Sequence, residues 1–407
     1  EAITIGTSAS FSLISTLDIE VLDKGLPVEG ATIIVDGQTV QTDVLGSATA
    51  QTTARTVDAQ GDVQEGTKTV TMQIGSFTEF FAWNVQQSTA HTFMASTVPT
   101  GTISSWLILE ETWSPYRLEG DLTVASNTRM TVNDGVELRI ASNAIIDVQG
   151  IFEAGTATIS STGFGARWGG LMLDGIVGSR VDLSGTLLAE GSPLITMAGR
   201  GDVSAQGTQF ARSAGADPLI SIYASSQSSL TLIDSELRDA GSMCIQSQSP
   251  DATIVLRDVE LSDCNGDGFW ARLSQIDVQG ITLGTGLEDG IDLTGTSGQI
   301  SGIQSSSFDG DYVIRMQSIE DGFLLEDSTI HPGNIGGVFA FMSEDITMNN
   351  LTVYGAPGID LDETSGEMNG IVLEGDGSGI GLTIRHGLSG PVVAEDIQIS
   401  DYSVGLK

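Results

Sequence analysis

One hydrophobic and polar pattern recurs through the second half of the chain. It is clearest in Leu230–Leu237, Ile254–Leu261, Ile276–Leu283, Phe323–Ile330 and Ile346–Val353. Each segment alternates apolar and polar residues on both sides of a central Asp, Gly or Asn, and a third short apolar run follows it. Neighbouring copies start at a nearly constant spacing, except for one double step that holds a weaker copy. Alternation predicts strands, and the fixed period predicts a solenoid.

Three strands and three turns in each period of roughly 22–24 positions correspond to one rung of a parallel β-helix, whose stacked rungs bury a continuous apolar column. A leucine-rich repeat of similar length is disfavoured because its Asn position and its Leu-x-x-Leu-x-Leu strand are missing. Similar short strands begin near Ser104, so we predict a β-helix over residues 99–407. Trp106 and Trp113 are expected to cover its first coil.

The preceding residues show a different pattern, with short alternating runs broken by Gly, Pro and Asp. Strands at this spacing predict a small β-sandwich over residues 16–98. Residues 1–15 contain two further apolar runs, Ala2–Ile5 and Phe11–Ile14. They form either the first strand of the sandwich or an extended arm that adds a strand to a neighbouring subunit.

Two motifs of this region carry a family resemblance. Lys24-Gly-Leu-Pro-Val-Glu-Gly-Ala-Thr-Ile-Ile-Val-Asp-Gly37, followed by Thr42-Asp-Val-Leu-Gly46, resembles the start of carboxypeptidase-regulatory-like and related Ig-like surface modules. The resemblance implies an Ig-like sandwich that serves as a spacer or attachment unit. Together with the repeats, the chain resembles right-handed parallel β-helix surface proteins of prokaryotes, of archaeal type. The expected fold class is therefore all-β, an Ig-like β-sandwich followed by a right-handed parallel β-helix.

Composition narrows the partners and the compartment. The chain has 53 acidic and 16 basic residues and a net charge of −37, so nucleic acid and anionic membranes are poor partners. At 40% hydrophobic residues it can still bury a core. It begins with Glu1 rather than Met and contains no apolar run long enough to span a membrane. We therefore expect a secreted, already processed chain at the cell surface or outside the cell.

The two cysteines, Cys244 and Cys264, are separated by slightly less than one rung. In an oxidising compartment they could bridge adjacent coils, which requires Cα atoms within roughly 7 Å. The alternative is a pair of buried free thiols. The sequence leaves both open.

A column of aspartates precedes the third strands. Asp267, Asp289 and Asp311 recur at a constant spacing of one rung, and stacked carboxylates repel one another unless something relieves them. Either each Asp caps its own turn and faces water, or the column is a Ca²⁺ ladder. No other cofactor is expected. Trp270 follows the apolar Phe269 and should point outward, so Trp270 and Tyr312 are candidate glycan contacts, with packing under a loop as the alternative.

No catalytic constellation is evident from the sequence. Polygalacturonases need several Asp on neighbouring rungs with Gly-His-Gly and Arg-x-Lys segments, and pectate lyases need a basic cleft. The three histidines, His91, His331 and His386, fit packing or surface roles better than catalysis. We therefore predict no enzymatic activity and a structural surface protein: a component of a sheath, lattice or filament, or an adhesin. The alternative is a carbohydrate-active β-helix protein, either a polysaccharide lyase or hydrolase or a glycan-binding adhesin.

Self-assembly is a sharper form of the structural hypothesis. Residues 402–407 read as mid-rung, which would leave unpaired strand edges open to a second copy. The partner would be the chain itself, head to tail or by strand donation, or other cell-surface proteins and glycans. The candidate assembly residues are Ile3, Ile5, Phe11, Leu13, Val404 and Leu406.

Overall fold

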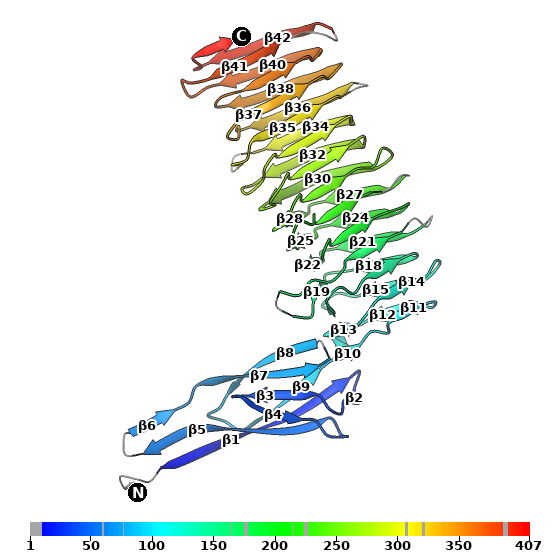
Figure 1. Cartoon of the computed structure of the whole chain (residues 1–407), viewed down its shortest axis with the longest axis vertical. Helices are drawn as coiled ribbons and strands as arrows, with labels where there is room; N and C mark the ends of the chain where they lie inside the picture. The colour runs from blue at the N-terminus through cyan, green and yellow to red at the C-terminus, as the bar shows by residue number, and fades with distance from the viewer. Residues whose placement is uncertain are drawn as a thin grey trace.

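A computed structural model describes residues 10–58, 61–75, 77–163, 165–174, 178–213, 215–223, 227–305, 308–319, 322–385 and 390–407. Within these residues the chain is all-β apart from one 3₁₀ turn, η1 (Glu111–Trp113). A β-sandwich is followed by a right-handed parallel β-helix, and the two parts follow one another along the long axis (Figure 1). This confirms the predicted fold class.

The sandwich consists of two sheets. The first contains β1 (Phe11–Asp23), β2 (Leu26–Pro27), β5 (Ser47–Asp58), β6 (Gly61–Gln64) and β9 (Thr89–Met94), and the second contains β3 (Thr32–Val35), β4 (Gln38–Gln41), β7 (Thr67–Ile74) and β8 (Phe77–Asn84). Strand alternation turns Leu17, Ile19 and Val21 of β1 inward, where they share a core with Phe77 and Trp83 of β8. The Ig-like assignment and the domain boundaries stay predictions.

Part of the N-terminal extension is now placed. Residues 11–15 belong to β1, where Phe11 pairs with Val57 of β5. The two alternatives for residues 1–15 as a whole stay predictions. Ile3 and Ile5 lie outside the described residues.

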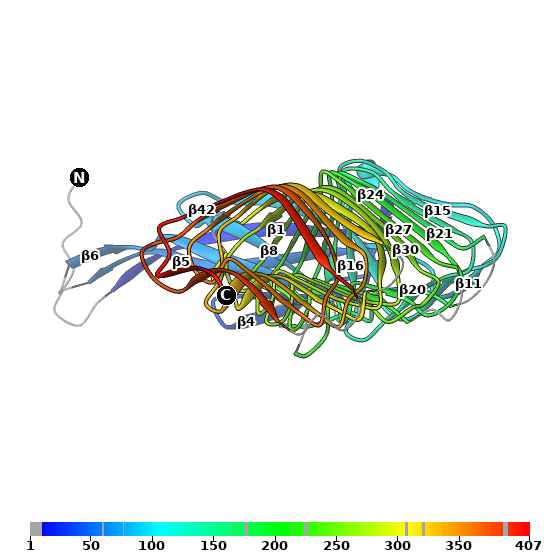
Figure 2. The ribbon, with the colours of Figure 1, turned by 90° about the horizontal axis from the view of Figure 1, so that it is seen from above.

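The helix is built from two long sheets of parallel strands. The minor sheet, which holds the predicted third strands, contains β11 (Gly101–Ile103), β14 (Leu122–Val124), β17 (Ile146–Val148), β20 (Leu171–Leu173), β23 (Ile195–Met197), β26 (Ile220–Ile222), β29 (Ile245–Ser247), β31 (Phe269–Arg272), β33 (Ile291–Thr294), β35 (Tyr312–Gln317), β37 (Gly336–Phe341), β39 (Ile359–Asp362), β41 (Ile380–Arg385) and β43 (Val404–Leu406). Figure 2, seen from above, shows the rungs progressively offset from the cyan first rungs to the red last ones.

The major sheet holds the first two strands of every rung. Its strands are β10 (Ser96–Thr97), β12 (Leu107–Leu109), β13 (Tyr116–Leu118), β15 (Arg129–Val132), β16 (Glu137–Ile140), β18 (Ile151–Ala154), β19 (Thr158–Ser161), β21 (Arg180–Ser184), β22 (Leu187–Ala189), β24 (Asp202–Gln206), β25 (Gln209–Ala211), β27 (Ser229–Ile233), β28 (Glu236–Arg238), β30 (Thr253–Ser262), β32 (Gln275–Leu283), β34 (Ser297–Gln304), β36 (Phe323–Ile330), β38 (Ile346–Tyr354), β40 (Gly366–Glu374) and β42 (Val392–Ser400). From β30 onward one bent strand replaces the pair.

The bend has a local cause in the backbone. The central residue of successive rungs adopts a left-handed conformation, with φ between 49° and 72°, at Asp234, Asp258, Gly280, Gly302, Asp327, Asn350, Gly370 and Asp396. Asp, Asn and Gly tolerate this conformation best, which is why the pattern could be read from the sequence.

The rungs differ in length along the helix. Ile276 stands opposite Ile254, as the predicted period requires. Phe152 instead faces Val181, which lies well beyond one predicted period along the chain. The longer rung folds Trp168 back under the strands, where it is fully buried and its indole N–H donates to the Ala189 carbonyl at 2.8 Å. The predicted period therefore holds best in the later rungs.

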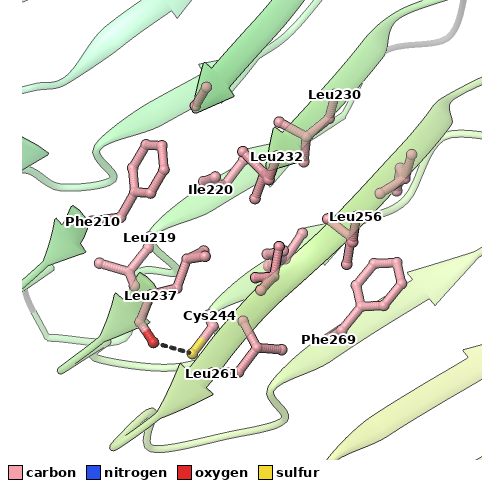
Figure 3. Packing of buried hydrophobic residues seen from close by; sticks show 14 of the residues in the cluster. Phe210, Leu219, Ile220, Leu230, Leu232, Leu237, Cys244, Leu256, Leu261 and Phe269 are labelled. Carbon is pink, nitrogen blue, oxygen red and sulfur yellow. Dashed lines mark hydrogen bonds between the residues drawn. The ribbon is translucent and has the colours of Figure 1, made fainter. Parts of the chain in front are cut away.

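The inner face of the helix is a continuous apolar column. Figure 3 shows it around Phe210, Leu232, Leu256 and Phe269, which come from three consecutive rungs and point into the same interior. Each such side chain is stabilised by the rungs on either side of it.

The two cysteines lie in this region. Cys244 and Cys264 form a disulfide with Cα atoms 5.6 Å apart. Of the two states that the sequence left open, the bridged one is therefore present.

The sandwich is docked onto the first rungs through Arg139 of β16. Its guanidinium pairs with Glu79 at 2.5 Å, donates to the Thr78 carbonyl at 2.8 Å and lies 5.3 Å from the centre of the Phe77 ring. Arg117 of β13 also donates to the Ala95 carbonyl at 3.1 Å. Both arginines belong to the helix and their partners to the sandwich, so the contact is specific.

Candidate functional site

The outer face of the minor sheet carries a column of charged and aromatic side chains. In these strands an inward apolar residue is followed by an outward one, because side chains alternate along a strand, although β35 buries both Val313 and Ile314 before its outward residue. Trp270, Asp292, Arg315, Phe339 and Asp360 therefore stand opposite one another on consecutive strands β31, β33, β35, β37 and β39. Neighbouring strands are about 4.8 Å apart, so each side chain reaches the next.

Further polar and aromatic residues flank this column. We call the whole set the acid–aromatic face: Trp270, Arg272, Asp292, Tyr312, Arg315, Phe339, Phe341, Asp360, Asp362 and Arg385.

The aromatic members form two groups. The Tyr312 ring stacks on Phe339 with centroids 5.3 Å apart, and Phe341 continues the series at 6.5 Å from Phe339. On the first strand, the Arg272 guanidinium lies 4.7 Å from the centre of the Trp270 ring. Trp270 points outward as predicted, and its neighbour Phe269 is fully buried. The predicted contacts Trp270 and Tyr312 thus lie on the same face.

The charged members pair across strands. One nitrogen of Arg315 lies 3.7 Å from Asp289 and 3.8 Å from Asp292. Arg385 pairs with Asp360 and lies 3.9 Å from Asp362. Each of these arginines is thus shared between two carboxylates, and the three arginines of the face are matched by its three aspartates.

The aspartate column lies beside this face, and two of its carboxylates bind backbone N–H groups of the following rung. Asp267 Oδ1 accepts the backbone N–H of Asp289 at 3.1 Å, and Asp289 Oδ1 accepts the backbone N–H of Tyr312 at 2.9 Å. Asp267 and Asp289 are 8% and 5% exposed. Capping of their own turns in water is therefore wrong for these two residues. Each carboxylate satisfies a turn N–H of the following rung, which stacking brings within reach.

Burial raises the pKa of several of these carboxyl groups. For Asp267 it raises the pKa to about 7, against the opposing effect of the Asp289 N–H. Burial also raises the pKa of Asp289 and of Asp292, and nearby Arg315 partly offsets both shifts. The pKa of Asp360 is raised by burial too. Shifted carboxyl groups clustered on one face are typical of functional sites.

The calcium hypothesis gains no support from this arrangement. Among the residues that the structure describes, no group of three or more His, Cys, Asp or Glu side chains is placed to hold a metal ion. One oxygen of Asp267 and one of Asp289 already accept a backbone N–H. A Ca²⁺ ladder at Asp267, Asp289 and Asp311 stays a prediction from spacing alone.

The face has the chemical features needed to bind a sugar and to transfer a proton. Aromatic rings stack on the apolar faces of sugar rings, and carboxylates accept hydrogen bonds from hydroxyls. Asp289 and Asp292 lie 3.7 and 3.8 Å from one guanidinium nitrogen. Two oxygens at these distances from the same nitrogen lie closer together than roughly 9.5 Å, the upper limit for the paired carboxylates of glycosidases.

The remaining predicted residues are not brought into this site. His91 stacks on Phe81 at 3.8 Å and His331 on Tyr354 at 4.7 Å, consistent with packing roles, and His386 lies outside the described residues. The exposed candidate assembly residues are Phe11, Leu13, Val404 and Leu406. Self-assembly through them stays a prediction.

Trp106 corrects another expectation. It was predicted to cover the first coil, but it is 70% exposed, whereas Trp113 packs partly buried against the core. Trp106 directly precedes the short strand that begins at Leu107, so alternation turns it outward.

No family model and no curated protein matches the chain. Among solved structures, the periplasmic alginate epimerase AlgG matches 70% of this chain and 77% of its own at 12% identity, with a TM-score of 0.45. The catalytic unit of a GH87 α-1,3-glucanase from Streptomyces thermodiastaticus matches 98% and 90% at 11% identity, TM-score 0.26. A family 28 exopolygalacturonase from Yersinia enterocolitica matches 95% of both chains at 9% identity, TM-score 0.30.

These structures correct the prediction that the chain is not an enzyme. All three are similar to this chain in fold, and all three are named as enzymes that process glycans. The prediction rested on the absence of family motifs from a linear sequence. A parallel β-helix assembles its sites from residues about one rung apart, so a missing linear motif does not exclude catalysis.

No helix long and apolar enough to cross a membrane occurs in the described part of the chain.

Proposed function

We propose that this protein is carbohydrate-active: it binds a glycan across the acid–aromatic face and acts on it by acid–base chemistry. One observation carries the proposal. Five adjacent strands of the minor sheet present Trp270, Asp292, Arg315, Phe339 and Asp360 in a single outward column. Aromatic rings give apolar contact with sugar rings, and the polar groups between them can orient hydroxyls.

The charge of the face favours a neutral glycan. Arg315 and Arg385 are each shared between two carboxylates, and Arg272 covers Trp270. The face therefore has no excess of positive charge, and the chain as a whole carries a net charge of −37. A polyuronate would meet electrostatic repulsion, whereas a neutral polysaccharide would not.

Asp292 and Asp289 are the residues proposed for proton transfer. Asp292 lies in the outward column, and burial raises its pKa, which favours the protonated form that a general acid requires. Asp289 is the more buried of the two, and Arg315 lies between them. In this proposal Asp292 protonates the glycosidic oxygen as the C–O bond breaks, and Asp289 accepts a proton from the attacking water.

We also propose that the protein works outside the cytoplasm, in a secreted or surface location. The Cys244–Cys264 disulfide supports this, because such bonds persist mainly in oxidising compartments.

The test combines binding with product release. Wild-type protein is incubated with dextran, laminarin and soluble starch, with alginate and polygalacturonate as anionic comparators, and new reducing ends are measured. Asp292→Asn is expected to lower the rate at least a hundredfold with little change in binding. Phe339→Ala is expected to weaken binding at least tenfold.

The matched control is Asp277→Asn, which removes a carboxylate paired with Arg257 on the major sheet. It should change neither readout. Binding without new reducing ends would retain the glycan site and overturn the acid–base role. Failure of the wild-type protein to bind any of the neutral polysaccharides would overturn the proposed function.

A further inference from the structure

A groove lies on the other sheet, near the start of the helix. Its volume is about 710 Å³, and it lies over β15, β18, β21 and β24 of the major sheet. Its floor includes Thr131, Glu153, Asp182 and Ser204, which stand opposite one another on consecutive strands. The groove therefore follows the helix axis, and no residue of the acid–aromatic face lines it.

The lining is rich in hydrogen-bond acceptors, with Val132, Ala154 and Leu183 among its apolar members. Besides the floor it includes Asn133, Asp134, Ser184 and Gln206. The Asp134 carboxylate is oriented by the backbone N–H of Thr156, which donates to it at 2.7 Å. Hydroxyls, amides and carboxylates in one groove suit a ligand with many hydroxyl groups.

Arginines on the adjacent outward column limit the negative charge of the groove. Arg129 lies 3.4 Å from Glu153, and Arg180 lies 2.6 Å from Asp182. The Arg129 Nε is buried without a hydrogen-bond partner. Four carboxylates line the groove, at Glu111, Asp134, Glu153 and Asp182, and these arginines pair with two of them. With no cation in excess, the groove suits an uncharged ligand better than an anion.

An exposed aromatic ring lies at the first-rung end of this arrangement. Trp106 is 70% exposed, and the Arg129 guanidinium is 5.5 Å from the centre of its ring. Ile108, directly opposite the floor residue Thr131, is 52% exposed. The apolar surface of an indole exposed to water is hydrated unfavourably. A sugar ring that stacks on it would remove this surface from water.

We propose that this groove is a second carbohydrate-binding site, which holds a neutral polysaccharide chain along the helix axis with Trp106 as its stacking platform. The site does not depend on the acid–aromatic face. With both sites, one molecule can hold two chains, or two stretches of one chain, on different sheets and different rungs.

The test measures retardation in gels that contain dextran, laminarin or soluble starch. Trp106→Ala removes the platform, and Ser204→Tyr fills the groove. Both residues are exposed, so neither change should affect folding, which circular dichroism checks. Each variant is expected to lower affinity for one of these polysaccharides at least tenfold, whereas Leu273→Ala, which removes another exposed apolar side chain, should not.

The outcome separates the two sites. If the groove binds polysaccharide and the acid–aromatic face does not, Phe339→Ala binds as tightly as wild type does. Trp106→Ala and Ser204→Tyr then lose binding. If both variants bind every polysaccharide as tightly as wild type, or if wild type binds none, the groove site is overturned.

Discussion

The sandwich and the β-helix pair their strands and form their hydrophobic cores in different ways. In the sandwich, most neighbouring strands are antiparallel, and the core is local, with Phe77 and Trp83 of one strand among its largest members. In the helix, each strand pairs in parallel with the strand one rung later. Every position therefore belongs to a column of equivalent positions.

This difference explains where a site can form. An outward residue in the helix is placed about 4.8 Å from its counterpart in the next rung. Residues far apart in sequence, such as Trp270 and Asp360, thereby share one column. The sandwich offers no such register. Among the described residues, both sites proposed here lie on the helix.

The largest expected effect separates the two cores. Phe269→Ala should destabilise the protein by about 3–5 kcal/mol, because it leaves a cavity in the column. The loss should expose amides in neighbouring rungs and leave the sandwich protected in hydrogen–deuterium exchange. Phe77→Ala, a loss of the same side chain in the sandwich, should show the opposite pattern. Uniform loss of protection in both variants would contradict two separable cores.

The disulfide should matter to the helix alone. Replacing Cys244 and Cys264 together by Ser removes a cross-link that closes a short loop, for which chain entropy predicts about 3 kcal/mol. Thermal unfolding followed by circular dichroism, with and without reductant, measures the change. The Tm of the wild type should fall when the protein is reduced, and the Tm of the double variant should not change. Equal response of both proteins to reductant would show that the bond does not stabilise the fold.

The stability of the fold should depend on pH, and the raised pKa of Asp267 determines the direction of this dependence. Its pKa in the folded protein is raised to about 7 from 3.8, so folding favours the protonated form. The stabilising effect is complete below about pH 4 and is lost as the pH rises toward 7. A difference of one pKa unit is worth about 1.4 kcal/mol, so part of this shift is enough to move Tm by a few degrees.

Asp267→Asn tests this directly, because the amide oxygen can still accept the Asp289 N–H. The variant should be more stable than wild type at pH 8 and similar to it at pH 4. Asp311→Asn, two column members further along, is the matched control. An identical dependence of Tm on pH in wild type and Asp267→Asn would contradict the buried carboxyl.

The smallest effect tests whether the two parts are independent. Arg139→Gln removes the cation beside Glu79, whose pKa burial already raises, and should cost about 1–2 kcal/mol at neutral pH. The change should loosen β8 in hydrogen exchange while the later rungs stay protected. Adding Glu79→Gln should restore much of the loss. No effect of either change would show that this ion pair does not hold the parts together.

Much of the fold could be predicted because its causes are local. The bend of each rung requires a left-handed residue, and Asp258, Gly280 and Asn350 are residues that tolerate it. Alternation then defines the inner and outer faces. Rung length was predicted less well, since Phe152 and Val181 enclose a loop whose packing depends on the buried Trp168.

The candidate site was only partly predicted. Trp270 was correctly placed by the rule that the residue after an inward apolar residue points outward. The same rule applied to the other third strands would have found Asp292 and Phe339. It would have missed Arg315, because Val313 and Ile314 before it are both buried. The aspartate column was recognised, but its hydrogen-bond partner was not, because the N–H belongs to a turn one rung later. Such a partner depends on stacking and cannot be read from spacing.

The first strand of the sandwich has a mechanical consequence. The chain enters the sandwich through β1, which runs parallel to β9, and it leaves through β9 toward the helix (Figure 1). A pull between the entering and leaving ends therefore loads the β1–β9 pair along the strands. Their backbone hydrogen bonds, from Leu17 and Thr89 to Leu22 and Met94, must then yield together rather than one at a time. Such a shear geometry lets the sandwich carry tension to the rungs of the helix while it stays folded.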